Sequence, residues 1–154
     1  MDRDALLDRY RIGAAAFAAA LDGLTDAHLD AVPGDGGWTP RMVAHHVADS
    51  ETNSYIRLRR LIAEVAPVII GYDEERWSRH LRYGSRPIAS AVAVVHAVRA
   101  ACLELLLTLD DDDWAQATGR HTESSGAYTL ETWLRTYALH PHEHADQIRR
   151  ALDA

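Results

Sequence analysis

Long stretches with apolar side chains at helical spacing constrain this sequence most. Between Asp4 and Leu24, apolar side chains recur at intervals that suit one face of a helix: Leu6, Leu7, Tyr10, Phe17, Leu21 and Leu24. Three further stretches show the same period, and we find no alternation of the kind that marks a strand. The pattern predicts an all-α chain built from four long amphipathic helices.

Prolines and capping residues set the limits of the second helix. Residues 32–37 read Val-Pro-Gly-Asp-Gly-Gly, which is a loop composition. Thr39 is suited to the N-cap and Pro40 to the first helical position, where the missing N–H of proline costs nothing. We expect the helix to run to about residue 66, because Pro67 disfavours helical geometry in the residue before it.

Prolines, capping residues and apolar spacing also predict the helices in the rest of the chain. We expect a short helix near Asp73–Leu81 inside a connection, then a third long helix over 85–109. The acidic run Asp110–Asp113 is expected to be a solvated helix end rather than a metal site, since consecutive side chains point in different directions. After a polar loop at 119–126, a fourth helix is predicted over 129–152, with a threonine as its N-cap. Four such helices predict a four-helix bundle with long connections.

Composition narrows the function classes. A chain of 154 residues suits a single domain, 1–154. The net charge of −7 argues against a nucleic-acid partner, which requires a basic face. No apolar run reaches the roughly 20 residues of a membrane-spanning helix. The single cysteine, Cys102, lies in an apolar run and is expected in the core. With no disulfide possible within the chain, we expect a cytoplasmic protein.

Two histidines on the predicted fourth helix, His140 and His144, stand four residues apart. When Leu130 is placed at zero and each residue adds 100°, the apolar side chains lie within about 40° of zero. His144 then lies about 40° and His140 about 80° to one side, whereas His142 lies about 120° to the other. The pair borders the apolar face, where two imidazoles can hold one metal ion, and His142 is expected outside the site.

The same test separates the neighbours His45 and His46 on the second helix. His46 lies within about 80° of the centre of the apolar stripe over 43–65, and His45 lies nearly opposite and is expected in solvent. Three inward histidines, His46, His140 and His144, would leave a metal ion with an open coordination position, as in catalytic zinc sites. The alternative for each of them is a hydrogen-bonded core histidine.

The remaining histidines and one proline complete this part of the pattern. Pro141 lies inside the fourth helix and cannot supply an N–H to the carbonyl of Tyr137, so we expect a kink or a bulge beside the site. The alternative is a helix that breaks and restarts. The other histidines have no partner at ligand spacing and are expected to be structural or on the surface: His28, His80, His96 and His121.

Several segments resemble proteins of the DinB/YfiT-like superfamily, in particular its YfiT branch. The first is Gly-Trp-Thr-Pro at 37–40, followed by His-His-Val-Ala-Asp-Ser-Glu-Thr-Asn-Ser-Tyr-Ile-Arg at 45–57. The second is Tyr-Asp-Glu-Glu-Arg-Trp-Ser at 72–78. The third is Thr-Leu-Glu-Thr at 129–132 with the histidines of 140–144.

This resemblance implies a fold and a metal site. It covers the chain from about residue 36 to 151 and implies a bundle of the DinB/YfiT type, commonly a homodimer, in which three histidines bind nickel or zinc. Carried over position by position, the ligands are His46, His140 and His144. The chain departs from the family pattern at Glu51, where near relatives carry another histidine, and at Pro141. These departures concern the shape of the pocket and the substrate rather than the ligands.

The resemblance also suggests a reaction on a small-molecule substrate. Relatives in the superfamily include S-transferases that use a low-molecular-weight thiol such as bacillithiol, mycothiol or glutathione. A metal ion with an open position can hold a thiol as its thiolate, or can lower the pKa of a water molecule. We therefore expect a metal-dependent thiol S-transferase. A metal-dependent hydrolase and a non-catalytic stress module that binds metal or a small ligand are the alternatives.

Three side chains near the predicted ligands have roles that the sequence leaves open. Asp49 either orients a ligand histidine or pairs on the surface with His45 or Asn53. Trp38 either forms a wall at the mouth of the pocket or packs as a hydrophobic staple at the start of the second helix. Glu143 points away from the apolar stripe and is expected in solvent.

Overall fold

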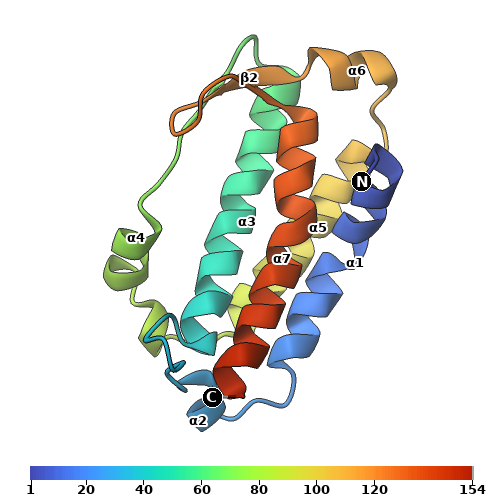
Figure 1. Cartoon of the computed structure of the whole chain (residues 1–154). Coiled ribbons are helices and arrows are strands. Elements are labelled where there is room, and N and C mark those ends of the chain that lie inside the picture. Colours follow the sequence, from blue (N-terminus) through green and yellow to red (C-terminus); the bar gives the residue numbers. More distant parts are fainter. Residues whose placement is uncertain (154) are drawn as a thin grey trace.

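A bundle of four long helices makes up most of the computed structural model, which describes residues 1–153 (Figure 1). These helices are α1 (Arg3–Leu21), α3 (Pro40–Ala63), α5 (Ala89–Leu106) and α7 (Leu130–Leu152). Each packs against two neighbours, in the cyclic order α1, α7, α3 and α5. The prediction of an all-α four-helix bundle is confirmed. Ala154, the last residue of the predicted domain, lies outside the described residues.

The connections between the long helices decide their directions. The short helix α2 (Asp26–Leu29) joins α1 to α3 at one end of the bundle. From the far end of α3 the chain then returns through β1 (Val68–Ile69), α4 (Glu74–His80) and the 3₁₀ turn η1 (Tyr83–Ser85). Because of this long return, α5 runs parallel to α3 (Figure 1). The predicted long connections are therefore present.

The helix starts that the capping residues predicted are confirmed. The hydroxyl of Thr39 accepts from the backbone N–H of Met42 at 3.3 Å, and that of Thr129 accepts from Thr132 at 3.1 Å. The ends are less accurate: α3 stops at Ala63, and Ala66 already has a left-handed φ of 47°. The third long helix is also shorter than the predicted 85–109.

A small three-stranded sheet accompanies the helices in the described chain, although we found no alternating strand pattern in the sequence. Its strands are β1, β2 (Thr118–His121) and β3 (Ala127–Thr129). Arg120 in β2 pairs in parallel with Val68 and in antiparallel fashion with Ala127. Strands of two to four residues are too short to show alternation. Gly119 permits the close pairing, since a Cβ there would lie 2.4 Å from the carbonyl oxygen of Pro67. Most of the predicted polar loop is thus a hairpin.

The acidic run begins a helix instead of ending one. Asp110 is the N-cap of α6 (Asp111–Gln116), and its carboxylate accepts from the backbone N–H of Asp113 at 2.9 Å. The carboxylate of Asp113 accepts in return from the backbone N–H of Asp110 at 3.1 Å. Carboxylates are favoured in the first turn of a helix because they satisfy its free N–H groups. The prediction of solvated side chains is confirmed, and the predicted helix end is wrong.

The core of the bundle consists of two apolar clusters. One surrounds Trp133 and Leu106, and the other surrounds Phe17 and Ile148. Cys102 belongs to the first cluster, as predicted, and burial raises the pKa of its thiol. Between the clusters, in the middle of the bundle, lies a polar layer that we define by Glu51, Arg99 and His140.

Helix α7 contains Pro141 but continues as an α-helix from Leu130 to Leu152, so the predicted bulge or break is wrong. A proline leaves the carbonyl four residues before it without a helical N–H. Here the carbonyl of Tyr137 accepts instead from the Nη1 of Arg99 on α5, at 3.0 Å. A donor from another helix thus satisfies the group that the proline leaves unpaired.

Helix α5 has the length and composition of a membrane span, with a mean hydropathy of 1.6 over its 18 residues. The core helix of a bundle can meet the same criterion. The inward side chains of α5 include Val95, Arg99 and Cys102, and small apolar side chains such as Ala93 and Ala97 lie outside.

Candidate metal centre

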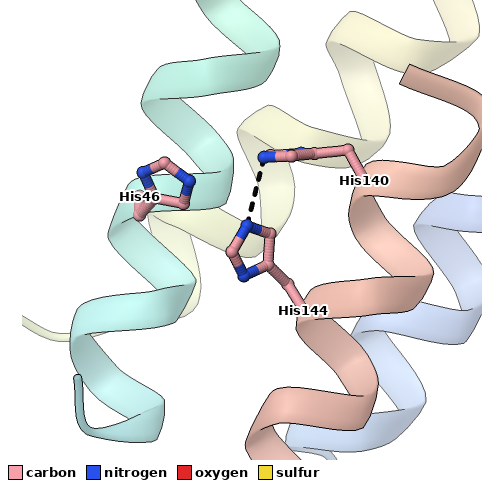
Figure 2. A group of neighbouring side chains, drawn as sticks. All are labelled: His46, His140 and His144. Carbon is pink, nitrogen blue, oxygen red and sulfur yellow. Dashed lines mark hydrogen bonds between the residues drawn. The ribbon is translucent and has the colours of Figure 1, made fainter. Parts of the chain in front are cut away.

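The structure brings together the three histidines that helix phase selected. His46 extends from α3, and His140 and His144 extend from α7 toward it (Figure 2). One ring nitrogen from each lies within 4.8 Å of the others. The Nε2 atoms of His140 and His144 are 3.1 Å apart. Two imidazole nitrogens bound to one tetrahedral zinc ion lie about 3.3 Å apart, given Zn–N distances of ~2.0–2.1 Å. The group could therefore hold one metal ion.

The hydrogen bond on the far side of His144 sets its tautomer. The side-chain oxygen of Gln147, which can only accept, lies 2.7 Å from the Nδ1 of His144. Nδ1 therefore carries the proton, and the Nε2 of a neutral imidazole keeps its lone pair. That lone pair points at the Nε2 of His140. Such convergence suits a cation bound between the rings.

Burial keeps these rings uncharged. It lowers the pKa of His46 to about 3, with a further contribution from His144. Burial also lowers the pKa of His140 well below its usual value, and the pKa of His144 moves in the same direction. Neutral imidazole is the form that binds metals. Among residues 1–153, the buried Nδ1 atoms of His46 and His140 have no hydrogen-bond partner. The donor set therefore fits a transition metal.

Trp38 forms a wall of this site. Its ring lies edge-on to that of His46, with centroids 4.8 Å apart, and its indole N–H donates to the Oε2 of Glu75 at 3.1 Å. The ring of Trp38 also makes an edge contact with the ring of Tyr83. Of the two roles considered for Trp38, the wall agrees with these contacts.

The two acidic residues considered near the site lie apart from the ligands. Asp49 accepts a hydrogen bond from the hydroxyl of Tyr83, and its backbone carbonyl accepts from Asn53. Neither of the roles that we considered for its carboxylate is observed. The long connection between α3 and α5, which we call the crossover, places Tyr83 against it. Glu143 is exposed, as predicted.

His45 and His142 are outside the site but are not solvated. His45 is 5% exposed, so the prediction that it faces solvent is wrong, and His142 is 8% exposed. The Nε2 of His45 lies 3.2 Å from the carbonyl oxygen of Arg86, and that of His142 lies 3.1 Å from the carbonyl oxygen of Arg9. The crossover before α5 covers one histidine and α1 covers the other. A single-helix phase argument cannot anticipate either cover.

Sequence reasoning missed the partners of the candidate ligands. Glu51 is completely buried, and its Oε1 lies 4.0 Å from the Nδ1 of His140 and 2.7 Å from the Nη1 of Arg99. Burial raises the pKa of Glu51, and the adjacent guanidinium opposes that shift. The sequence of α5 contains an indication of such a partner, because Arg99 lies on the apolar stripe of the helix. Around the helix axis it is about 40° from Val95 and 60° from Cys102. A charged residue in that position calls for a buried partner of opposite charge.

A cavity of about 270 Å³ lies along α3. Asn53 and Arg57 are among its lining residues, and both lie within about 20° of His46 around the helix axis. Trp77 and Ile70 from the crossover line its other side. None of the three histidines is among the residues that line this cavity, which lies farther along α3 than the candidate metal centre.

Comparison with known proteins agrees with this fold. The family model of the DinB superfamily matches residues 9–148. A Bacillus subtilis protein named “Putative metal-dependent hydrolase YfiT” is 36% identical over 129 residues, which are 84% of this chain and 72% of that protein. An Oceanobacillus iheyensis protein with a similar name is 37% identical over 125 residues, or 81% of this chain and 71% of its own.

A solved structure shows the same architecture. It is described as “YfiT from Bacillus subtilis is a probable metal-dependent hydrolase with an unusual four-helix bundle topology”. The superposition has a TM-score of 0.89 at 31% sequence identity and covers 98% of this chain and 87% of that one. The family model, the sequence relatives and the fold agree, and this chain belongs to the DinB superfamily, in which it is similar to YfiT.

Proposed function

We propose that this protein is a metal-dependent enzyme that binds one divalent transition metal, nickel or zinc, through His46, His140 and His144. The observation that carries the proposal is the convergence of the three rings, with two Nε2 atoms 3.1 Å apart. A metal ion held by three neutral imidazoles keeps an open position, where it lowers the pKa of a bound thiol or water. The names of the relatives support metal dependence.

Between the two reactions, we place S-transfer from a low-molecular-weight thiol, such as bacillithiol, ahead of hydrolysis. Metal-dependent hydrolases often combine the metal with a nearby carboxylate that acts as a general base. The carboxylates near the site already have partners: Glu51 accepts from Arg99, Asp49 from Tyr83, and Glu75 from Trp38. A thiol that ionises at the metal can attack an electrophile with no such base.

The residues of the chain would then bind and orient the reactants. Trp38 shields one side of His46 from water. The cavity farther along α3 offers space for a small molecule, with Arg57 as a cationic group for an anionic part of it. Gln147 holds the Nδ1 proton of His144 and so keeps its Nε2 available.

The relatives' names favour hydrolysis as the second candidate, with metal-activated water in place of the thiol. A non-catalytic stress module that binds metal or a small ligand is the third possibility. To separate them, nickel- or zinc-loaded protein is mixed with a model electrophile, with and without bacillithiol, mycothiol or glutathione. We expect turnover that depends on the thiol and on metal. Metal-dependent release of product without any thiol would identify a hydrolase, and metal binding without turnover would favour the module.

Elemental analysis of protein purified without added metal tests metal binding, which both enzyme proposals require. We expect close to one equivalent of nickel, zinc or another transition metal per chain. Less than about half an equivalent would contradict the enzyme proposal.

We also propose that the protein is a homodimer of the cytoplasm, as the family resemblance and the cysteine content led us to expect. The small apolar side chains on the outer face of α5, including Ala93 and Ala97, support a further packing partner. Light scattering tests the assembly, since a dimer has twice the chain mass of 17.1 kDa.

A further inference from the structure

Arg99 joins all four long helices at one point in the polar layer. It extends from α5 and is 3% exposed. Its Nη1 donates to the Oε1 of Glu51 on α3 at 2.7 Å and to the carbonyl of Tyr137 on α7 at 3.0 Å. Its Nη2 donates to the carbonyl of Tyr10 on α1 at 2.6 Å, and the guanidinium lies over the Tyr10 ring. A guanidinium held by contacts to three other helices has little freedom to move.

Two residues with unusual backbones make this arrangement possible. Pro141 removes the N–H that would otherwise occupy the Tyr137 carbonyl, which is therefore free to accept from Arg99. Gly13 on α1 provides the space, because a Cβ there would lie 2.7 Å from the Nη2 of Arg99 and 3.3 Å from the Pro141 ring. The position of Arg99 therefore depends on three other helices.

Arg99 in turn fixes the carboxylate of Glu51 behind a candidate ligand. Glu51 accepts from Arg99 and, at 3.3 Å, from the hydroxyl of Ser54. Its Oε1 lies 4.0 Å from the Nδ1 of His140, a buried nitrogen with no hydrogen-bond partner among the described residues. The opposite ring nitrogen of His140 points into the site. The gap is about 1 Å longer than a hydrogen bond, so a small tilt of the imidazole closes it.

We propose that Glu51, held by Arg99, is the positioning residue for His140 in the metal centre. Its carboxylate accepts the Nδ1 proton of His140 and so keeps the Nε2 unprotonated and directed at the metal. It also places a negative charge between Arg99 and the bound cation. The side-chain oxygen of Gln147, which is neutral, fixes the tautomer of His144 in the same way, by accepting its Nδ1 proton. A carboxylate behind a ligand histidine strengthens the ligand as a base. This inference rests on the metal binding proposed above.

The test compares Glu51→Gln with Glu143→Gln, which removes an exposed carboxylate on α7. Zinc affinity is measured by competition with a chromogenic chelator, on protein whose folding is checked by circular dichroism. We expect Glu51→Gln to bind zinc about 10–100-fold more weakly than the wild type, and Glu143→Gln to bind within about twofold of it. Wild-type affinity in Glu51→Gln would overturn the inference while leaving the proposed function intact. A wild type that binds no zinc would overturn both.

A second variant addresses the danger that Glu51→Gln leaves Arg99 as an uncompensated buried charge. Glu51→Gln combined with Arg99→Met removes both charges. If Glu51 serves only to neutralise Arg99, the paired variant binds zinc as tightly as the wild type, and the inference is wrong. We expect the weakening of zinc binding to persist in it.

Imidazole nitrogen NMR of the zinc-loaded wild type provides a readout independent of affinity. We expect a slowly exchanging proton on the Nδ1 of His140, with zinc on its Nε2, and faster exchange of that proton in Glu51→Gln. Zinc on the Nδ1 of His140 would contradict the proposal.

Discussion

Two sets of histidines, all buried or partly buried, lie on the same two helices and differ in what their Nε2 atoms contact. In the metal centre, the Nε2 atoms of His140 and His144 face one another. On the flanks of the same helices, the Nε2 atoms of His45 and His142 each lie against a backbone carbonyl. Burial alone therefore does not distinguish a candidate ligand from a structural histidine. The distinction is whether the Nε2 atoms face one another or a backbone carbonyl.

The largest expected effect concerns metal content. His144→Ala removes one of the three proposed nitrogen ligands, and we expect the bound metal to fall from one equivalent to almost none. His142→Ala should retain its full metal content, because that nitrogen contacts the carbonyl of Arg9. Elemental analysis of both variants, purified in parallel, checks this. Equal loss of metal in the two variants would show that the two sets of histidines do not differ in metal binding.

The second expected effect concerns acid stability of the metal-free protein. The pKa of His46 is lowered to about 3 in the folded state, whereas an unfolded histidine titrates near 6.5. Because the unfolded chain binds more protons between these values, stability is complete above about pH 6.5 and falls as the pH drops toward 3. The shift corresponds to at most roughly 5 kcal/mol.

Urea unfolding at a series of pH values measures this dependence. The variant His46→Leu serves as the comparison, since it lacks the titrating ring. We expect a shallower pH dependence in the variant. An unchanged slope would show that His46 does not contribute to the loss of stability in acid.

The third expected effect concerns stability rather than metal content. His45→Ala removes an imidazole contact from the carbonyl of Arg86, which keeps Arg41 as a donor, and His142→Ala removes one from the carbonyl of Arg9. The loss of one intramolecular hydrogen bond costs about 0.5–1.5 kcal/mol. Urea unfolding should show a loss of this size in both variants, with unchanged metal content. Wild-type stability would mean that these contacts are not structural.

The smallest expected effect lies at Pro141, between His140 of one set and His142 of the other. Proline inside a helix usually costs about 3 kcal/mol or more. Here Arg99 already satisfies the Tyr137 carbonyl, so Pro141→Ala should change the free energy of unfolding by no more than about 1 kcal/mol. Urea unfolding is the measurement. A gain near 3 kcal/mol would show that Arg99 does not compensate for the proline.

The sequence was sufficient for the local features of this protein. Capping at Thr39 and Thr129 depends on residues three positions apart, so the chain order is enough to predict it. Helix phase depends only on the 3.6-residue period, and it selected the three histidines that the structure brings together. Their assignment as metal ligands stays a prediction until metal is measured.

Only the tertiary structure decided the features that need two distant segments. The strands β1 and β2 form because residues about 50 positions apart meet, and each is too short to have a sequence pattern. The burial of His45 depends on the crossover that covers α3. The two departures from the family pattern both involve Arg99, which donates to Glu51 and to the Tyr137 carbonyl that Pro141 leaves free. Sequence determined which side chains face inward, because that depends on local backbone geometry. The fold decided which buried polar groups meet, because that depends on how separate helices pack.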